Sequence, residues 1–366
     1  MLQGRCALPL DVRDILQKAI SQGASDIHLK VDSPPVIRVA GTIRKLQEEP
    51  LTREDTFRIA FELMSEEHRG LFQRRNEVDF AFSLSGLSRF RMNIFRSRGA
   101  VQLSIRVVPM EIPDLKDLNL PAKLSDIAML NKGLVLITGP TGSGKSTTLA
   151  AMTEIINRNR SAHIVTIEDP IEFLFQDKSS IITQRELGQD TQSMASALNN
   201  VFREDPDVIL IGEIRDRETL ETALTASETG HFVMGTLHTS GAAATVCRII
   251  DMFPGYQQQQ IRAQLSGVLQ AVISMKLLSR VDRPGLIPAV ELLVVTPLVR
   301  DLILVSGREA ELPDAMERGR QQYGMITLDS ELARLYKKGL ISEEDALAAA
   351  ANPGNLALKI SGLMHG

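Results

Sequence analysis

The residues that point most directly to chemistry form one short run, Gly139-Pro140-Thr141-Gly142-Ser143-Gly144-Lys145-Ser146. Its spacing fits the phosphate-binding pattern G-x-x-x-x-G-K-[ST]. In such a loop the glycines let backbone N–H groups turn toward the phosphates, the lysine reaches the terminal phosphates, and the last hydroxyl ligates Mg²⁺. We therefore expect a nucleoside triphosphate with Mg²⁺, held by Gly139, Pro140, Thr141, Gly142, Ser143, Gly144, Lys145, Ser146 and the adjacent Thr147.

The segments on either side of this run support the interpretation. Leu134–Thr138 before it is a continuous apolar run, typical of a buried parallel strand. Thr147–Asn157 after it carries apolar residues at helical spacing. Strand, loop and helix thus come in the required order, with a helix N-terminus beside the phosphates. A chance glycine-rich turn, the alternative, does not account for these flanks.

A second candidate lies within Arg203–Asp216, where the apolar strand Val208–Ile211 runs into Gly212 and Glu213. Ligands bind at the carboxyl ends of strands in open α/β sheets, so a carboxylate there lies beside the phosphate loop. General P-loop ATPases carry Asp then Glu at this point, but the Asp position is Gly212 here. Glu213 is therefore expected to orient the attacking water, to help hold Mg²⁺, or to do both. The alternative is a solvated carboxylate at a strand end.

A third candidate is the acidic pair Glu168-Asp169, which follows the apolar strand His163–Ile167. Carboxylates at another strand end could supply the Mg²⁺ or water contact that Gly212 cannot make. Pro170 is expected to end the strand. We take Glu168 as the candidate group, whereas Asp169 either shares this role or caps the following turn.

His238 is the fourth candidate, because it follows the apolar strand Phe232–Thr236. At that edge of the sheet it could sense the γ-phosphate or donate a hydrogen bond to it. A structural hydrogen bond is the alternative. His163 begins its strand, at the opposite edge, and we expect both it and His28 to be structural.

Arginines are a further group of candidates. An arginine that stabilises the charge on the transferred phosphoryl group raises the rate of phosphoryl transfer by about 10³–10⁵. Arg89 and Arg91 alternate on one strand, and Arg106 lies on a neighbouring one. Arg91 and Arg106 are expected to project from a common sheet face. They would act in catalysis if this part of the chain packs over the nucleotide, from the same or an adjacent subunit. A solvated strand face is the alternative.

The composition sets wider limits. The chain has 366 residues, 43% of them hydrophobic, which suggests two or three domains. A net charge of −4 argues against a general nucleic-acid binder. Cys6 and Cys247 form no metal or redox spacing and suit a reducing compartment. No signal-peptide pattern and no run of about 18 apolar residues occurs, so we expect a cytoplasmic protein, with peripheral attachment to a membrane complex left open.

The pattern of elements changes along the chain. Residues 1–110 read as an α+β domain that includes a long helix over 51–74. Prolines punctuate 111–122, which we interpret as a linker. Residues 123–295 alternate apolar strands with helices, which indicates an α/β core with a parallel sheet. From 296 to 366 the chain is expected to be helical.

Together these motifs resemble the type II/IV secretion ATPase superfamily. Arg203–Asp207, followed by apolar residues and Gly212–Asp216, is similar to the pattern by which that superfamily is identified. Ala24–His28, Gly86–Arg91 and Gly339–Ser342 resemble segments of its PilT group, the type IV pilus retraction ATPases. The similarity runs over nearly the whole chain. The four-cysteine zinc site and longer N-terminal region usual in the assembly ATPases are not found in this sequence.

The resemblance implies a PAS-like N-terminal domain, a RecA-like P-loop ATPase domain and a helical C-terminal region. It also implies a cytoplasmic homohexamer that hydrolyses ATP with Mg²⁺. That ring would be peripherally associated with the inner membrane, with a pilus platform protein and a related pilus ATPase as partners and no nucleic acid. In the family the nucleotide lies between the two domains. Arg91 and Arg106 would reach its phosphates, and Glu168, Glu213 and His238 correspond to the family's acidic and histidine boxes.

One segment departs from the group's pattern. The group carries a C-terminal Ala-Ile-Arg-Asn-Leu-Ile-Arg-Glu motif associated with retraction, and the corresponding residues here are Leu298–Val305. Arg300, Leu302 and Ile303 match, whereas the final Arg-Glu pair is absent. We therefore predict a motor for pilus retraction and twitching motility, and keep two alternatives: an accessory pilus ATPase, and a slowly hydrolysing nucleotide-dependent scaffold. A P-loop kinase is disfavoured because no acceptor-binding lid is evident.

Overall fold

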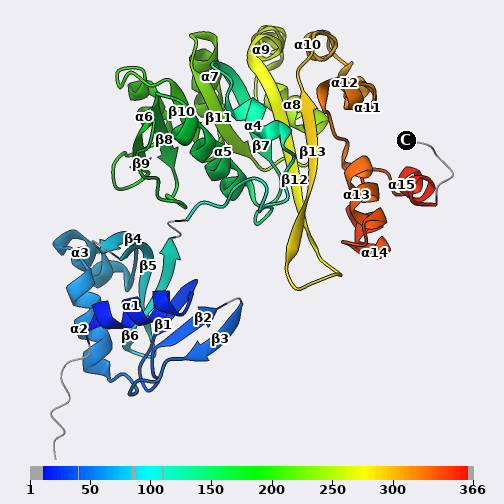
Figure 1. Cartoon of the computed structure of the whole chain (residues 1–366). Helices are drawn as coiled ribbons and strands as arrows, with labels where there is room; N and C mark the ends of the chain where they lie inside the picture. Colours follow the sequence, from blue (N-terminus) through cyan, green and yellow to red (C-terminus); the bar gives the residue numbers. More distant parts are fainter. Residues whose placement is uncertain (1–10, 40, 85–86, 109–110, 362–366) are drawn as a thin grey trace, which may run out of the picture. The chain divides into compact units, whose positions relative to one another are not determined.

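The computed structural model describes residues 11–39, 41–84, 87–108 and 111–361, so Cys6 and Gly86 lie outside the described residues. The chain divides into two compact units, Met1–Glu111 and Ile112–Gly366. Figure 1 labels their elements along the chain. The expected fold class is confirmed: an α+β unit comes first, then an α/β unit that contains the glycine loop, and then a helical C-terminal region.

The first unit is built on a six-stranded antiparallel sheet with the order β3-β2-β1-β6-β5-β4. Alternate residues of its strands, among them Ile27, Phe90 and Ile105, lie in one apolar core. Helix α2 packs against β6 and α3 against β4. The elements in chain order are α1 (Val12–Ser21), β1 (Asp26–Leu29), β2 (Val36–Val39), β3 (Thr42–Lys45), α2 (Arg53–Leu63), α3 (Glu66–Arg75), β4 (Glu77–Leu84), β5 (Ser88–Ser97) and β6 (Ala100–Val108).

The single helix expected over 51–74 is wrong, because the structure has two helices there. The backbone of Met64 is extended, with φ −84° and ψ 135°, which ends α2. Ser65 then caps α3, since its side chain accepts a hydrogen bond from the backbone N–H of His68 at 3.2 Å. A serine hydroxyl satisfies an otherwise unpaired N–H at a helix start, which favours the break at this point.

The second unit is built on a seven-stranded sheet with the order β13-β12-β7-β11-β10-β8-β9. All neighbouring pairs are parallel except β12–β13. Its elements are α4 (Lys123–Ala128), β7 (Gly133–Thr138), α5 (Lys145–Asn159), β8 (His163–Glu168), β9 (Ile181–Glu186), α6 (Met194–Val201), β10 (Val208–Ile211), α7 (Arg217–Glu228), β11 (Phe232–Leu237), α8 (Ala242–Asp251), α9 (Gly255–Val268), β12 (Leu269–Ser279), β13 (Leu286–Val294), α10 (Pro297–Leu304), η1 (Glu309–Glu311), α11 (Leu312–Arg318), α12 (Arg320–Tyr323), α13 (Leu328–Lys337), α14 (Glu343–Ala349) and α15 (Pro353–Ile360).

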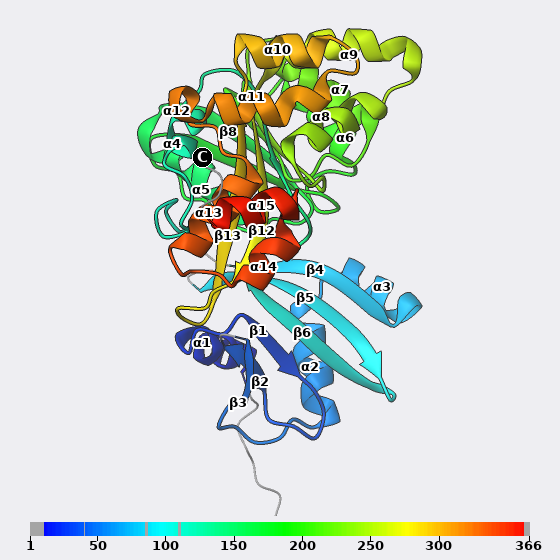
Figure 2. The same ribbon diagram turned by 90° about the vertical axis from the view of Figure 1, so that its right-hand side faces the viewer.

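Helices cover both faces of this sheet. Leu134 and Leu136 of β7 lie in one core with residues of α6 to α11, whereas Val135 and Ile137 lie in another with α4 and α5. Burial on both faces explains why the central strands read as continuous apolar runs. Helices α13 to α15 form a further cluster with Ile287 of β13, and Figure 2 shows them in front of β12 and β13.

Candidate functional site

Four neighbouring strands bring the candidate residues of the second unit to one edge of the sheet. The order β7-β11-β10-β8 is parallel throughout, so all four strands end on the same side. The glycine loop follows β7, His238 follows β11, Glu213 follows β10, and Glu168 is the last residue of β8. Residues from four separate segments therefore meet at the edge where parallel sheets bind ligands.

The glycine loop turns between β7 and α5, which begins at Lys145. Gly139 has φ +140°, and a Cβ there would lie 2.4 Å from the carbonyl oxygen of Met275 and 2.6 Å from Oγ of Ser143. No larger residue fits this position, because the backbone of β12 is in contact with the loop there. Ser146 and Thr147 follow in the first turn of α5, where both are half-buried.

Lys145 is buried, with 8% of its surface exposed. Its Nζ donates hydrogen bonds to the carbonyl oxygens of Gly139, at 2.8 Å, and Pro140, at 3.0 Å. Burial lowers the pKa of Lys145, and the negative charges of Glu213 and Glu172 act against that shift. The ammonium group is thus held at the loop, close enough to the carboxylate of Glu213 to interact with its charge.

Two buried hydroxyl groups at the loop indicate whether it can bind a phosphate group. Oγ1 of Thr138 and Oγ of Ser143 are buried and have no hydrogen-bond partner among the described residues. Buried polar atoms nearly always have a partner, so such orphans call for a ligand or an ordered water. With the N-terminus of α5 and Lys145, they form a donor-rich cradle that fits phosphate oxygens.

Glu213 is the centre of a three-residue cluster. Its Oε1 accepts a hydrogen bond from Nε2 of His238 at 2.8 Å, and its Oε2 lies 2.8 Å from Nη2 of Arg215. The carboxylate is 21% exposed and the imidazole 47%, so solvent and substrate can reach both. Burial acts to raise the pKa of Glu213, but Arg215 and His238 outweigh it and lower the pKa below its usual range. The carboxyl group of Glu213 is therefore ionised at neutral pH.

Gly212 has a steric reason to lack a side chain. Its backbone N–H donates to the carbonyl oxygen of Ile167 at 2.8 Å, which ties it to β8. A Cβ at this position would lie 3.1 Å from Cα of Glu168 and 3.3 Å from that same carbonyl oxygen. An Asp at 212 would require the end of β8 to shift by a few tenths of an ångström, and Glu213 is the carboxylate that follows β10.

Glu168 lies deeper than the other candidates, with 9% of its surface exposed. Its Oε1 accepts hydrogen bonds from Oγ1 of Thr166 at 2.7 Å and from Nε2 of Gln184 at 3.2 Å. Burial raises the pKa of Glu168 although these hydrogen bonds oppose the rise. Its carboxyl group is hydrogen-bonded to residues of β8 and β9 in this structure, whereas Glu213 is only partly buried.

Asp169 and Arg215 complete the cluster. Nη1 of Arg215 donates to Oδ2 of Asp169 at 3.2 Å, so this arginine connects the ends of β8 and β10. The sequence analysis did not assign Arg215 a role. Arg215 lies four residues after the end of β10, within the motif Gly212–Asp216, and this position was the available signal. Only the folded loop shows which carboxylates it contacts.

The candidate arginines belong to the first unit, which is described by itself. Arg91 of β5 and Arg106 of β6 lie opposite each other in register, so they share one sheet face. Asp26 of β1 is the partner of Arg106 on the other side, and Nε of Arg106 donates to its Oδ1 at 2.9 Å. Arg106 keeps 70% of its side chain exposed, and its catalytic role and that of Arg91 stay predictions.

His163 and His28, which we expected to be structural, each lie within hydrogen-bond distance of residues on neighbouring segments. His163 lies with Nδ1 3.2 Å from the carbonyl oxygen of Asp205 and Nε2 3.0 Å from Oγ1 of Thr183. Nδ1 of His28 lies 3.3 Å from Oγ of Ser104. In the ranges that the structure describes, no cluster of three or more His, Cys, Asp or Glu side chains could hold a metal by itself.

Comparison with known proteins identifies the family of this chain. The profile of the type II/IV secretion system protein family matches residues 3–300. The chain belongs to this family. Among its relatives, the type IV pilus retraction ATPase PilT of Pseudomonas aeruginosa is 41% identical, over 94% of this chain and 100% of that protein. The type IV pilus ATPase PilU of the same organism is 40% identical, over 96% and 91%.

A solved structure of a family member shows the same fold. The crystal structure of the pilus retraction motor PilT with bound ADP superposes with a TM-score of 0.87 at 48% identity, and covers 95% of this chain and 99% of that one. None of the helices described here is long and apolar enough to cross a membrane.

Proposed function

We propose that this protein is an ATP-hydrolysing motor of the type IV pilus machinery that powers pilus retraction. The observation that carries the proposal is the ionised Glu213, held between His238 and Arg215 at the sheet edge where Lys145 lies. A positioned carboxylate next to a phosphate loop is the arrangement that activates water for phosphoryl transfer. The retraction ATPase that the chain matches over nearly its full length supports the pilus assignment.

Each residue at the edge has a proposed task. Lys145 and the backbone N–H groups of Gly142 to Thr147 hold the phosphates, and the hydroxyl of Ser146 would hold Mg²⁺. When bound, Mg²⁺ neutralises phosphate charge and orients the phosphates. Glu213 takes the proton of the attacking water, and His238 hydrogen-bonds to Glu213 and to the γ-phosphate. Glu168, which Thr166 and Gln184 hold in place, would supply a further contact to Mg²⁺ or to the water.

The proposed motor is a homohexamer in which Arg91 and Arg106 stabilise the charge on the phosphates. It works in the cytoplasm, peripherally associated with the inner membrane, on a pilus platform protein. Phosphate held jointly by Lys145 and by arginines of another rigid unit would connect hydrolysis with motion of that unit.

Steady-state phosphate release tests hydrolysis. The full chain should turn over ATP with Mg²⁺ and stop when EDTA is added. Lys145→Ala should abolish turnover, whereas Lys132→Ala, at an exposed lysine just before β7, should leave it unchanged. ATP binding without phosphate release by the wild-type chain would overturn the motor and support the nucleotide-dependent scaffold.

An accessory pilus ATPase is the second candidate, and one observation favours it. Leu304 and Val305, which stand where the retraction group carries Arg-Glu, are exposed to 37% and 47% at the end of α10. The match to PilU is compatible with this role. Motility of a strain without its retraction ATPases separates the two: rescue by this chain alone supports retraction, and rescue only together with a second pilus ATPase supports the accessory role.

A further inference from the structure

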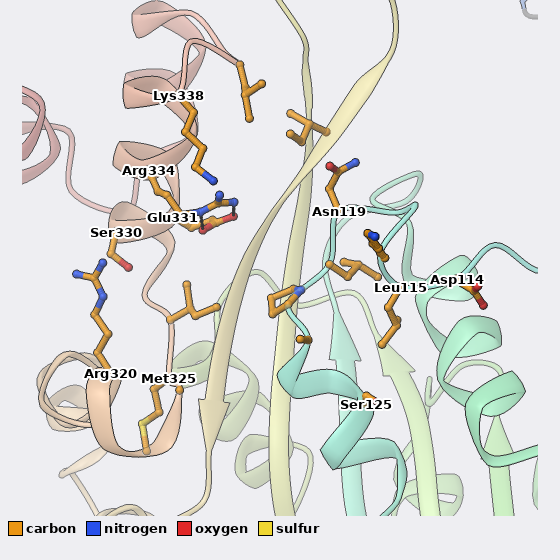
Figure 3. Close-up of a pocket in the computed structure, with 18 of the residues that line it drawn as sticks. Asp114, Leu115, Asn119, Ser125, Arg320, Met325, Ser330, Glu331, Arg334 and Lys338 are labelled. Atoms are coloured by element: carbon orange, nitrogen blue, oxygen red, sulfur yellow. Dashed lines mark hydrogen bonds and ion pairs between the residues drawn. The ribbon is translucent and has the colours of Figure 1, made fainter. Parts of the chain in front are cut away.

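A cavity of about 890 Å³ lies within the second unit, apart from the candidate site. Its lining residues include none of the strand-end residues described above. It opens between residues 114–125, which lead into α4, and the helices α12 and α13 (Figure 3). Its volume falls within the range of about 300–1,000 Å³ that small-molecule sites occupy.

The floor of this cavity is apolar and comes from several segments. Leu115 and Leu120 precede α4, Ile155 lies on α5, and Ile287 lies on β13. Leu115, Leu120 and Ile287 are buried in the cores of the unit, so the floor is fixed by packing. An apolar floor held by separate rigid elements suits a flat or aliphatic ligand body.

The two acidic residues of the lining are already neutralised within the protein. Oδ1 of Asp114 accepts from Nη1 of Arg158 at 2.9 Å. Arg334 forms a bidentate ion pair with Glu331, with Nε–Oε2 at 2.7 Å and Nη2–Oε1 at 2.6 Å. Figure 3 shows this pair beside Lys338. Neither carboxylate is therefore left to repel an anion from the cavity.

Three cations of the lining have no such partner. In the described part of the chain, no carboxylate lies within 4.0 Å of the charged groups of Lys116, Arg320 or Lys338. All three are exposed, and they come from the segment before α4, from α12 and from the end of α13. Lys116 and Lys338 thus place positive charge without an ion-pair partner among the described residues on both sides of an apolar floor, and Arg320, whose charge also acts on Glu317, adds to it.

We propose that this cavity binds an amphipathic organic anion. Its apolar body lies on the floor formed by Leu115, Leu120 and Ile287, and its phosphate, sulfonate or carboxylate group lies among the rim cations. The occupant is a nucleotide-like molecule or an acyl phosphate, which share this chemistry. The proposal does not depend on hydrolysis, because binding itself is measured.

The probe is 8-anilinonaphthalene-1-sulfonate, titrated by fluorescence into the full chain with the phosphate loop saturated by ADP. We expect one saturable site. Lys338→Glu should weaken the probe's affinity about threefold, the size of an exposed ion pair. The matched control is Lys337→Glu, at the neighbouring exposed lysine that does not line the cavity, and it should leave the affinity unchanged. Uncharged N-phenyl-1-naphthylamine should not distinguish the two variants.

A blocking variant tests the apolar part of the site. Ala122→Trp places a large ring in the cavity mouth and should remove the saturable site, and Lys338→Glu keeps the test valid if Ala122→Trp does not fold. Displacement of the probe by AMP supports a nucleotide-like occupant, and displacement by dodecyl phosphate supports an acyl one. Equal probe affinity in all variants, displacement by neither compound, or a change of oligomeric state on Ala122→Trp would overturn the proposal, the last by identifying the cavity as a subunit interface.

Discussion

Oε1 of Glu213 and Nε2 of His238 lie 2.8 Å apart and join the ends of two adjacent parallel strands, β10 and β11. The backbone fixes this pair, since the N–H of Ile214 donates to the carbonyl oxygen of Thr236 at 2.9 Å and Oγ1 of Thr236 donates to that of Gly212. The carboxylate and the imidazole thus extend from backbone segments that are hydrogen-bonded to each other, and not from a flexible loop. Such preorganisation lets a small change in either residue affect catalysis strongly.

Glu213→Gln removes the proposed base while it keeps the shape of the side chain. We expect turnover to fall by about 10²–10⁴, the usual contribution of a general base, with nucleotide affinity nearly unchanged. Phosphate release and fluorescent-nucleotide binding measure the two quantities. Glu218→Gln, at an exposed residue in the first turn of α7, is the matched control and should keep full activity. Undiminished turnover by Glu213→Gln would rule out this residue as the base.

Arg215→Ala should move the acid limb of the pH–rate profile to higher pH. Arg215 is the strongest influence that holds the pKa of Glu213 down against burial. Without it the pKa rises, so the base becomes protonated at a higher pH and activity is lost sooner as the pH falls. Turnover measured from below the ordinary glutamate pKa of 4.5 up to neutral pH tests this shift. Arg217→Ala is the control, because Arg217 pairs with Glu221 at 3.1 Å instead, and an unshifted limb in Arg215→Ala would contradict the argument.

Glu168→Gln should stabilise the protein increasingly as the pH rises. Burial raises the pKa of Glu168 above its ordinary value of 4.5, so the folded state binds its proton more tightly than the unfolded chain does. That contribution to stability is complete at pH values below the ordinary pKa. It is lost as the pH rises toward the raised one. The melting temperature of the variant should therefore exceed that of the wild type by a margin that grows as the pH rises. A margin that stays the same at every pH would show that folding does not raise the pKa of Glu168.

The strand ends could be predicted because their signals are local. β7, β8, β10 and β11 are mostly apolar, and the carboxyl ends of parallel strands lie at one edge of the sheet. The partners of Glu168 could not be predicted in the same way. Gln184 lies on β9, an edge strand of mixed polarity that the sequence analysis did not identify, so nothing indicated that the carboxyl group of Glu168 is engaged there.

Strand β12 escaped prediction for a different reason. It begins at Leu269, directly after α9 ends at Val268, with no turn residue between them. A short apolar run without a boundary cannot be distinguished from a continuing buried helix by periodicity. Its insertion beside β7 places Met275 against Gly139, so the wall of the phosphate loop depends on a strand more than 130 residues away.

The buried pair of Arg262 and Glu309 should matter more for stability than the exposed ion pairs. Their side chains are 8% and 9% exposed, and Nη1 of Arg262 also donates to the carbonyl oxygen of Ile303 at 3.0 Å. Arg262→Leu leaves a buried carboxylate without a partner and should cost about 3–5 kcal/mol. The double variant with Glu309→Leu should recover much of this loss. Urea unfolding measures both, and an additive or larger loss in the double variant would contradict the argument.

Arg91→Ala and Arg106→Ala test whether the arginine face of the first unit takes part in catalysis. Both should lower turnover at least tenfold, a conservative fraction of the effect of an arginine on the transferred phosphate, and leave assembly intact. Arg44→Ala is the control, because Arg44 pairs with Ile37, whose side chain lies on the opposite face of the same sheet.

A variant of Asp26 distinguishes a catalytic role of these arginines from a solvated sheet face. Asp26→Ala frees Arg106 from its ion pair, so turnover should fall less than in Arg106→Ala if Asp26 only orients the guanidinium. Light scattering of each variant should show the same oligomer as the wild type. An active monomer, or full turnover by Arg91→Ala and Arg106→Ala, would mean that these arginines form a solvated sheet face and that the phosphate loop works without them.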